Sequence, residues 1–206
     1  IYPSFVELYS DYGLKKQEKK KSDRNNWSSR SSDESQKGAY GWNTAIKPQT
    51  HAFRDFNVDE KSASNLRSHG FGTVLSHHQD GIARGTATLV TLSEKNSQTA
   101  LLNEQSGNFL SFNKGSSTTS YPRSLMGCIS LIKQSYLDAQ WYAAEGHKKE
   151  TNLSLQAWND NLSLTQFFVA KDKLNVLRAD KLAKAFGQNY IYVGGGDEYM
   201  RIDELN

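Results

Sequence analysis

The spacing of hydrophobic positions changes along this chain, and the changes predict an α/β protein. Between residues 120 and 143, apolar side chains recur every three or four positions, which is the spacing of one helix face. Short apolar runs such as 71–75 and 190–193 are instead bounded by glycine and polar residues, which is typical of buried strands. Because helical and strand-like segments alternate, we expect an α/β fold that contains parallel strands.

The last quarter of the chain carries the clearest example of this alternation. Residues 166–170 form an apolar run, Asp172 is a suitable helix cap, and an amphipathic segment then extends to Gly187. The run 190–193 predicts a second strand. Two strands joined by one helix indicate a parallel pair with a right-handed crossover.

Two further helix starts are visible in the polar pattern. Asn57 and Glu60 have the spacing of a capping box, so we expect a helix that begins there and ends near Gly70. Ser120, which precedes Pro122 by two positions, is expected to cap the long helix.

The middle of the chain departs from the helix–strand alternation. Three apolar runs, 87–92, 99–102 and 109–112, are separated by short polar segments. Segments of that length suit hairpins, so we expect an inserted β-hairpin or meander around residues 86–112. Earlier in the chain, the polar run 15–38 predicts a solvated loop within a polar insertion at about 15–50. The aromatic residues of 40–56 are expected to pack this connection against the core.

Composition limits the class of protein. With 206 residues the chain is long enough for a domain with a core, and we expect 1–206 to form a single module. The net charge of +3 is too small to indicate a nucleic-acid partner. No apolar run approaches the roughly 20 residues of a membrane span, and the single Cys128 excludes an internal disulfide. We therefore expect neither nucleic acid nor a membrane as partner.

Three phrases in the sequence resemble a known family. Residues 70–75 read Gly-Phe-Gly-Thr-Val-Leu and residues 80–86 read Asp-Gly-Ile-Ala-Arg-Gly-Thr. Both resemble imidazolonepropionase-like members of the amidohydrolase superfamily. Residues 1–14 are similar to the first barrel strand of that family, where Pro-Gly-Phe-Ile-Asp-x-His-x-His-x-Gly is expected. The positions in register with this phrase are Pro3, Phe5, Val6, Glu7 and Gly13.

The resemblance implies a metal-dependent hydrolase on a (β/α)8 barrel. The chain opens inside a strand-like run and stops on a helix-like one, so we expect a fragment of a larger bacterial protein with a partial TIM-barrel-like fold. The remainder of that parent protein is the expected partner. Open strand edges also predict a homodimer of the isolated fragment. The family suggests a periplasmic or secreted location, whereas the sequence itself identifies no compartment.

The family's metal ligands are replaced at every position that can be matched. Two histidines at i and i+2 of the first strand would share a face and bind one ion, but Tyr9 and Asp11 stand there. The histidines that end two later strands are replaced by Ala170 and Gly194. The resemblance therefore implies a pseudoenzyme: a module that binds no cofactor, is non-catalytic by itself and forms part of a larger hydrolase.

An active enzyme is the alternative interpretation. Asp11, His77 or His78 would then act as substitute zinc ligands for hydrolysis of carbon–nitrogen bonds in cyclic amides or peptides. Neighbours in an extended segment point to opposite sides, so at most one of the two histidines can join a given site. The structural interpretation is that both histidines are loop residues, and that Asp80 pairs with Arg84 to hold the loop.

A third hypothesis is an anion-binding module. The amides of Gly194, Gly195 and Gly196 lie where the last helix is expected to start, and such amides attract anions. The basic run 15–30 offers a second surface for an anionic partner. The glycine spacing is not that of a P-loop or a dinucleotide-binding fingerprint. A tight turn capped by Asp197 explains the glycines equally well.

Overall fold

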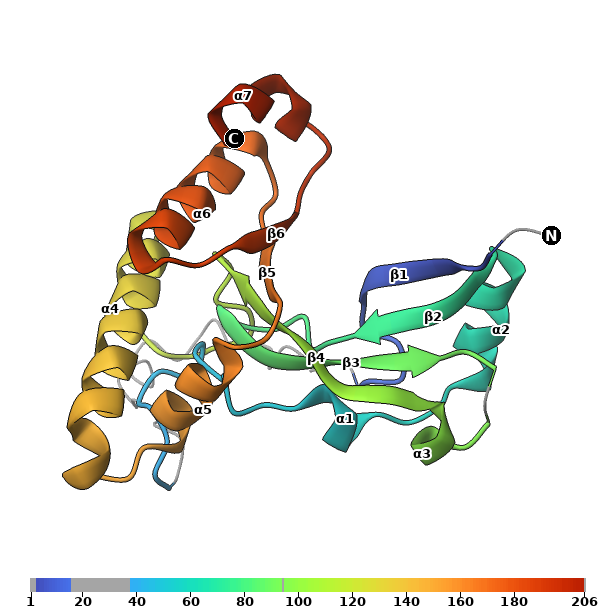
Figure 1. Ribbon diagram of the computed structural model, residues 1–206, viewed down its shortest axis with the longest axis horizontal. Coiled ribbons are helices and arrows are strands. Elements are labelled where there is room, and N and C mark those ends of the chain that lie inside the picture. The colour runs from blue at the N-terminus through green and yellow to red at the C-terminus, as the bar shows by residue number, and fades with distance from the viewer. Residues whose placement is uncertain (1–2, 16–37, 94, 206) are drawn as a thin grey trace, which may run out of the picture.

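The computed structural model describes residues 3–15, 38–93 and 95–205. Within these residues the strands form one mixed sheet in chain order (Figure 1): β1 (Phe5–Ser10), β2 (Phe71–Ser76), β3 (Ala83–Thr91), β4 (Leu101–Ser111), β5 (Gln166–Val169) and β6 (Tyr190–Val193). The pair β1–β2 is parallel, and so are β4, β5 and β6, whereas β3 runs antiparallel to both of its neighbours. This is an α/β, partial TIM-barrel-like arrangement, and it confirms the predicted fold class.

Helices cover the two ends of the sheet separately. In chain order they are α1 (Ala52–Asp55), α2 (Glu60–Ser68), α3 (Ser97–Ala100), α4 (Leu125–Ala144), α5 (Leu153–Asn161), α6 (Lys173–Phe186) and α7 (Ile202–Leu205), with 3-10 turns η2 (Gly146–Lys148) and η3 (Glu198–Arg201). Figure 1 shows α4, α5 and α6 beside the β4–β6 end, and α2 beside β1 and β2. In the described part of the chain, no helix has both the length and the apolar character that crossing a membrane needs.

Helix α2 begins two residues later than the capping box predicts. Asp59, not Asn57, is the N-cap, and its carboxylate accepts a hydrogen bond from the Lys61 amide at 3.1 Å. Asn57 instead uses its side-chain amide to donate to the Asp55 carbonyl. The chain offers two suitable caps close together, and the helix uses the second one and buries Ala63.

The hairpin predicted around residues 86–112 is present with two strands rather than three. β3 starts at Ala83, and β4 runs without interruption through the polar segment that was expected to be a loop. Gly107 lies in this segment because the Phe167 ring packs against it, and a side chain there would collide with that ring. Polar residues are tolerated in the first half of β4 because that half is exposed.

The long helix and the C-terminal unit follow the apolar pattern closely. α4 buries Ile132, Tyr136 and Ala139 as predicted, but its N-cap is Ser124, whose hydroxyl accepts from the Gly127 amide, rather than Ser120. The predicted unit 166–193 is confirmed: β5 and β6 are parallel, Asp172 caps α6, and Gly187 ends it in the left-handed region with φ +63°.

The structure describes only part of the predicted polar insertion. Residues 16–37 of the region 15–50 lie outside the described residues. The end of this region is not solvated, because Ala45 and Ile46 are buried and Ile46 bridges to Ala83 at the start of β3. The apolar pair anchors the connection to the sheet, as expected for the segment 40–56, and the solvated loop expected at 15–38 stays a prediction.

The interior of the partial barrel is a small apolar cluster with contributions from all six described strands. Leu75, Ala87, Phe109 and Phe167 form its buried part, and Tyr9, Leu89, Val169 and Val193 pack against them. The rings of Phe109 and Phe167 are stacked, with centroids 4.6 Å apart. Side chains from every strand meet here because the sheet curls around a shared interior.

Candidate functional site

A cavity of about 520 Å³ opens at the end of the barrel where β1, β4 and β5 finish and β3 starts. We call it the mouth cavity, and it is lined by Tyr9, Gln79, Arg84, Ser111, Phe112, Asn113, Leu125, Val169, Ala170, Lys171 and Asn175. Sites in barrels of this kind are generally built at the carboxyl ends of the parallel strands. Its volume lies within the range of small-molecule pockets.

Arg84 reaches the mouth cavity because β3 begins with a β-bulge. The register of β3 against β4 shifts between Ala83 and Thr86, where β3 carries one extra residue. Gly85 occupies this bulge with φ +80°, a left-handed conformation that glycine adopts without strain. The sequence Ala-Arg-Gly-Thr thus turns a charged side chain into the cavity from the first residues of a buried strand.

The Arg84 side chain is buried but incompletely bonded. Its residue is 4% exposed, and Nε donates to the Gly81 carbonyl at 3.2 Å. Nη1 is also buried and has no hydrogen-bond partner among the described residues. A buried, charged donor without a partner costs free energy.

His77 lies inside the barrel next to the cavity wall. It is 1% exposed, and its ring stacks on Phe109 with a centroid separation of 3.6 Å and an interplanar angle of 8°. The ring of Tyr9, which lines the cavity, is 5.0 Å away on another side. Neither ring nitrogen of His77 has a hydrogen-bond partner among the described residues.

The surroundings of His77 keep its imidazole neutral. Burial, and after it the positive charge of Arg84, lower the pKa of His77 from 6.5 to about 3. The imidazole therefore carries no charge at neutral pH, and Arg84 is the fixed positive charge of this region.

The rim of the mouth cavity adds to its positive potential. Lys171 follows β5 and is exposed at the opening. Leu125 and Asn175, in the first turns of α4 and α6, bring the amino ends of two helices to the same cavity. Helix amino ends carry partial positive charge, which the Asp172 carboxylate offsets at α6, whereas α4 is capped by the Ser124 hydroxyl and not by a carboxylate. The lining holds two cationic side chains and, among the described residues, no carboxylate.

Asp80 does not pair with Arg84, so that prediction is wrong. Its carboxylate accepts from Lys47 Nζ at 3.0 Å and from the Ser116 amide and hydroxyl. Burial works to raise the pKa of Asp80, but the Ser116 hydrogen bonds and the Lys47 charge outweigh burial and hold it below its ordinary value. Lys47 therefore neutralises the Asp80 carboxylate, and Asp80 does not offset the positive charge of Arg84.

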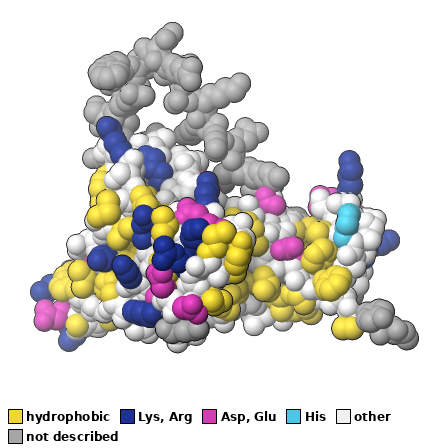
Figure 2. Space-filling model, turned by 90° about the horizontal axis from the view of Figure 1, so that it is seen from above, with side chains coloured by type: hydrophobic (Ala, Val, Ile, Leu, Met, Phe, Trp, Pro, Cys, Tyr) yellow, Lys and Arg dark blue, Asp and Glu magenta, His cyan; other side chains and the backbone are white. Residues whose placement is uncertain are grey.

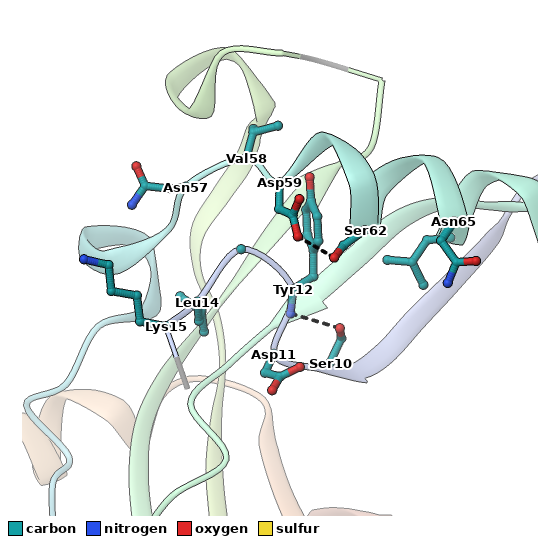
Figure 3. A pocket seen from close by; sticks show the side chains of 12 residues that line it. Ser10, Asp11, Tyr12, Leu14, Lys15, Asn57, Val58, Asp59, Ser62 and Asn65 are labelled. Carbon is teal, nitrogen blue, oxygen red and sulfur yellow. Dashed lines mark hydrogen bonds between the residues drawn. The ribbon is translucent and has the colours of Figure 1, made fainter. Parts of the chain in front are cut away.

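Tyr9 and Asp11, which stand where the family's first strand has its two metal-binding histidines, line two different cavities. Tyr9 lines the mouth cavity, whereas Asp11 lies beyond the end of β1 and lines a second hollow of about 710 Å³ between β1 and α2 (Figure 3). We call this hollow the outer pocket; it is lined by Ser10, Asp11, Tyr12, Gly13, Leu14, Lys15, Asn57, Val58, Asp59, Ser62, Asn65 and Leu66. The two side chains fail to share a face because the strand ends at Ser10, before the second of them.

The other predicted metal positions also supply no convergent ligands. Ala170 lines the mouth cavity, and Gly194 follows β6, but neither has a ligand atom in its side chain. His78 points away from His77, and its Nε2 lies 3.0 Å from the Asp55 carboxylate. Among the described residues, no group of three or more His, Cys, Asp or Glu side chains is arranged to hold a metal ion.

The glycine loop after β6 binds a carboxylate of this same chain. The Gly195 amide donates to Glu198 at 2.5 Å, and the Gly196 amide donates to the same carboxylate at 3.0 Å. Asp197, which was expected to cap the last helix, accepts instead from the Lys173 amide at the start of α6. The loop therefore has the anion-binding geometry that the glycines predict, with Glu198 as the bound group.

Surface charge shows no single-sign stripe on the face in Figure 2. Lys and Arg side chains gather there on the side that carries α6 and α7, among acidic and hydrophobic side chains. Nucleic-acid-binding surfaces typically present one sign over a continuous area. The mixture on this face is typical of a solvated surface.

Sequence reasoning assigned no binding role to Arg84 or Lys171. A signal for Arg84 was present, because one charged residue interrupts an otherwise apolar and β-branched run at 82–92. A charge in such a run must be exposed, paired or directed into a site. Lys171 carries a weaker signal, since lysines after strands are common on surfaces.

Comparison with known proteins gives one clear likeness in fold. No protein-family model matches the chain, and no curated protein matches it in sequence. The structure is similar to the crystal structure of an amidohydrolase from Thermotoga maritima MSB8, with a TM-score of 0.65 and 17% sequence identity. The match covers 93% of this chain and 51% of that one, so this chain spans about half the length of the amidohydrolase it resembles. The chain thus has the fold of part of an amidohydrolase.

Proposed function

We propose that this chain is an amidohydrolase-like half-barrel that has lost its metal site, is non-catalytic by itself and works as part of a larger hydrolase. One observation carries the proposal: the end of the barrel where such enzymes place their reactive groups holds the buried guanidinium of Arg84. The fold likeness to half of an amidohydrolase supports the hydrolase context.

A buried guanidinium opposes metal binding in its neighbourhood. Arginine remains charged at every pH at which the protein is folded. Repulsion between this charge and a divalent cation is weakly screened, because the group is only 4% exposed. A metal site in this cavity would need carboxylates to offset the repulsion, and the lining described above has none.

The alternative, a metal-dependent hydrolase of carbon–nitrogen bonds in cyclic amides or peptides, has one observation in its favour. His77 is neutral, and neither of its ring nitrogens has a partner among the described residues. Neutral imidazole is the form that coordinates zinc. Asp11 lines the outer pocket and His78 contacts Asp55, so the remaining substitute ligands lie in other environments.

Zinc content separates the two functions. The purified chain would be incubated with zinc chloride, dialysed and measured by elemental analysis, beside His77→Gln as the matched variant. We expect far less than one zinc per chain, with the same value in the variant. About one zinc per wild-type chain, lost in His77→Gln, would overturn the non-catalytic assignment and favour the hydrolase.

We further infer that the rest of a larger protein supplies the strands that complete the barrel. β1 and β6 are the two edges of the described sheet, and the β1 side chains Phe5, Val6 and Leu8 are 65%, 52% and 47% exposed. Open apolar edges favour pairing with another strand. About half of the matched amidohydrolase lies outside the alignment with this chain, which is consistent with missing strands.

The isolated chain should therefore pair through β1 with a second copy. Light scattering after size exclusion is expected to give the mass of a dimer. The double substitution Phe5→Lys, Leu8→Lys places charges on the exposed edge and should give a monomer. A monomeric wild-type chain would contradict this inference.

A further inference from the structure

We propose that the mouth cavity binds a small carboxylate ligand, with Arg84 contacting the carboxylate and Lys171 assisting at the rim. This inference rests on the proposed function, because it assigns a ligand class to the cavity that is proposed to have lost its metal. Arg84 lines the cavity and supplies its fixed charge, and the guanidinium is incompletely bonded, because no described residue accepts a hydrogen bond from Nη1. Hydrogen bonds between guanidinium groups and carboxylates are among the strongest in proteins.

The charges around the cavity favour an anion over a neutral or cationic ligand. The nearby carboxylates are already bonded to protein groups. Asp80 binds Lys47 and Ser116, and Asp172 accepts from the Asn175 amide at 2.9 Å and from the Asn175 side chain at 2.7 Å. Lys47 neutralises Asp80, and the Asp172 charge is directed to the amino end of α6, so the two cations of the lining set the sign of the potential inside the cavity.

The remaining lining indicates an organic acid rather than a bare inorganic ion. Phe112, Leu125, Val169 and Ala170 give the cavity an apolar wall. A cavity of about 520 Å³ is much larger than an inorganic oxyanion needs. The ligand class that fits both features has one carboxylate and a short apolar body.

A neutral amide of similar shape to the carboxylate tests whether binding depends on the ligand's charge. The full chain, pretreated with a chelator, would be titrated calorimetrically with benzoate, with benzamide and with inorganic phosphate. Benzoate and benzamide have similar shape and differ in charge. We expect saturable binding of benzoate, weaker binding of phosphate and none of benzamide. Equal binding of benzoate and benzamide, or no binding of benzoate, would overturn the proposal.

Substitutions locate the binding site. Arg84→Met should weaken benzoate binding by about tenfold or more, because it removes a charge-assisted hydrogen bond. Lys171→Ala should weaken it by roughly threefold, since an exposed charge is screened. Lys184→Ala is the matched control: this exposed lysine lies in the last turn of α6, outside the cavity lining, and pairs with Asp180, so its removal should leave binding unchanged.

Lys171→Ala keeps the proposal testable if Arg84→Met does not fold, because Lys171 is exposed and its truncation leaves the core intact. Unchanged benzoate affinity in Lys171→Ala would then overturn the proposal. A repeat with added zinc separates this failure from that of the proposed function. Benzoate binding that appears only with zinc would show a metal site and overturn both, whereas no binding under either condition overturns the carboxylate site alone.

Discussion

The mouth cavity and the outer pocket are similar in size but differ in the state of their polar groups. The mouth cavity is lined by the buried guanidinium of Arg84, whose Nη1 has no hydrogen-bond partner within the described part of the chain. The outer pocket is the larger one, at about 710 Å³, yet one of its charged groups, the Asp59 carboxylate, is already bonded: it contacts Ser62 and caps α2 (Figure 3).

Volume alone is therefore a poor guide to a binding site. The Asp59 carboxylate is exposed, and hydrogen bonds from Ser62 and Lys61 lower its pKa, so it is stabilised without a ligand. The Arg84 guanidinium is buried, and part of its bonding capacity is unused. An unsatisfied buried donor is a stronger indication of ligand binding than an open hollow.

The two regions should differ most in how much one of their apolar side chains contributes to the free energy of unfolding. Phe109→Ala removes a fully buried ring that stacks on both His77 and Phe167, so the free energy of unfolding should fall by about 3–5 kcal/mol. Leu66→Ala, at the half-buried wall of the outer pocket, should cost about 1 kcal/mol. Urea titrations followed by circular dichroism measure both values. Equal losses of unfolding free energy would show that the barrel interior is packed no more tightly than the wall of the outer pocket.

A second prediction concerns pH and the buried imidazole. His77 has its pKa lowered to about 3 in the folded chain, against 6.5 when exposed. Between these pH values the unfolded chain binds a proton that the folded chain does not. The His77 contribution therefore makes the folded state less stable as the pH falls, by about 2 kcal/mol between pH 7 and pH 5.

The variant His77→Phe isolates this contribution, because it removes the titrating group and keeps a ring against Phe109. Unfolding free energies at pH 7 and pH 5 should differ less in this variant than in the wild type. His69→Gln, at the exposed residue after α2, is the matched control and should keep the wild-type pH dependence. An unchanged pH dependence in His77→Phe would show that the buried ring does not set it.

A third prediction compares the helix caps beside the two hollows. Asp172→Ala removes the carboxylate that accepts from Asn175 at the start of α6, and should cost about 1 kcal/mol of unfolding free energy. Asp172→Asn keeps an oxygen acceptor and should cost less. Asp59→Ala should have a smaller effect than Asp172→Ala, because Asp59 is exposed. Thermal unfolding of the three variants gives this order, and a larger loss for Asp59→Ala would reverse the comparison.

The smallest expected effect concerns Asp11. If the outer pocket has no metal role, Asp11→Asn should change the unfolding free energy by less than about 0.5 kcal/mol and leave zinc content as it is in the wild type. Chemical denaturation and elemental analysis measure the two quantities. A drop in bound zinc in this variant would place Asp11 in a metal site after all.

Local elements of the fold could be predicted where several signals agreed. For 166–193 the apolar runs, the Asp172 cap and the Gly187 stop all indicated the same βαβ unit, and that unit is present. Helix starts were missed where the chain offered two caps a few residues apart, as at Ser120 and Ser124. Propensity cannot separate such caps, because the choice depends on which start lets the apolar face pack.

The mouth cavity could not be predicted because its parts are distant in the sequence. Tyr9, Arg84 and Val169 come together only after β1, β3 and β5 are placed in the same sheet. The direction of Arg84 depends on a bulge in the pairing of β3 with β4, which leaves no periodic signal. Residue types in the sequence indicated possible chemistry. Which side chains come together depends on how β3 pairs antiparallel with β2 and β4.

The loop after β6 illustrates how a covalent tether excludes competitors. Glu198 is attached to the backbone that supplies its own amide donors at Gly195 and Gly196. Its effective concentration at those amides is therefore at least in the millimolar range, which a dilute free anion does not match. The tethered side chain holds the connection from β6 to η3 in place, so free phosphate should gain access to these amides only after that carboxylate is removed.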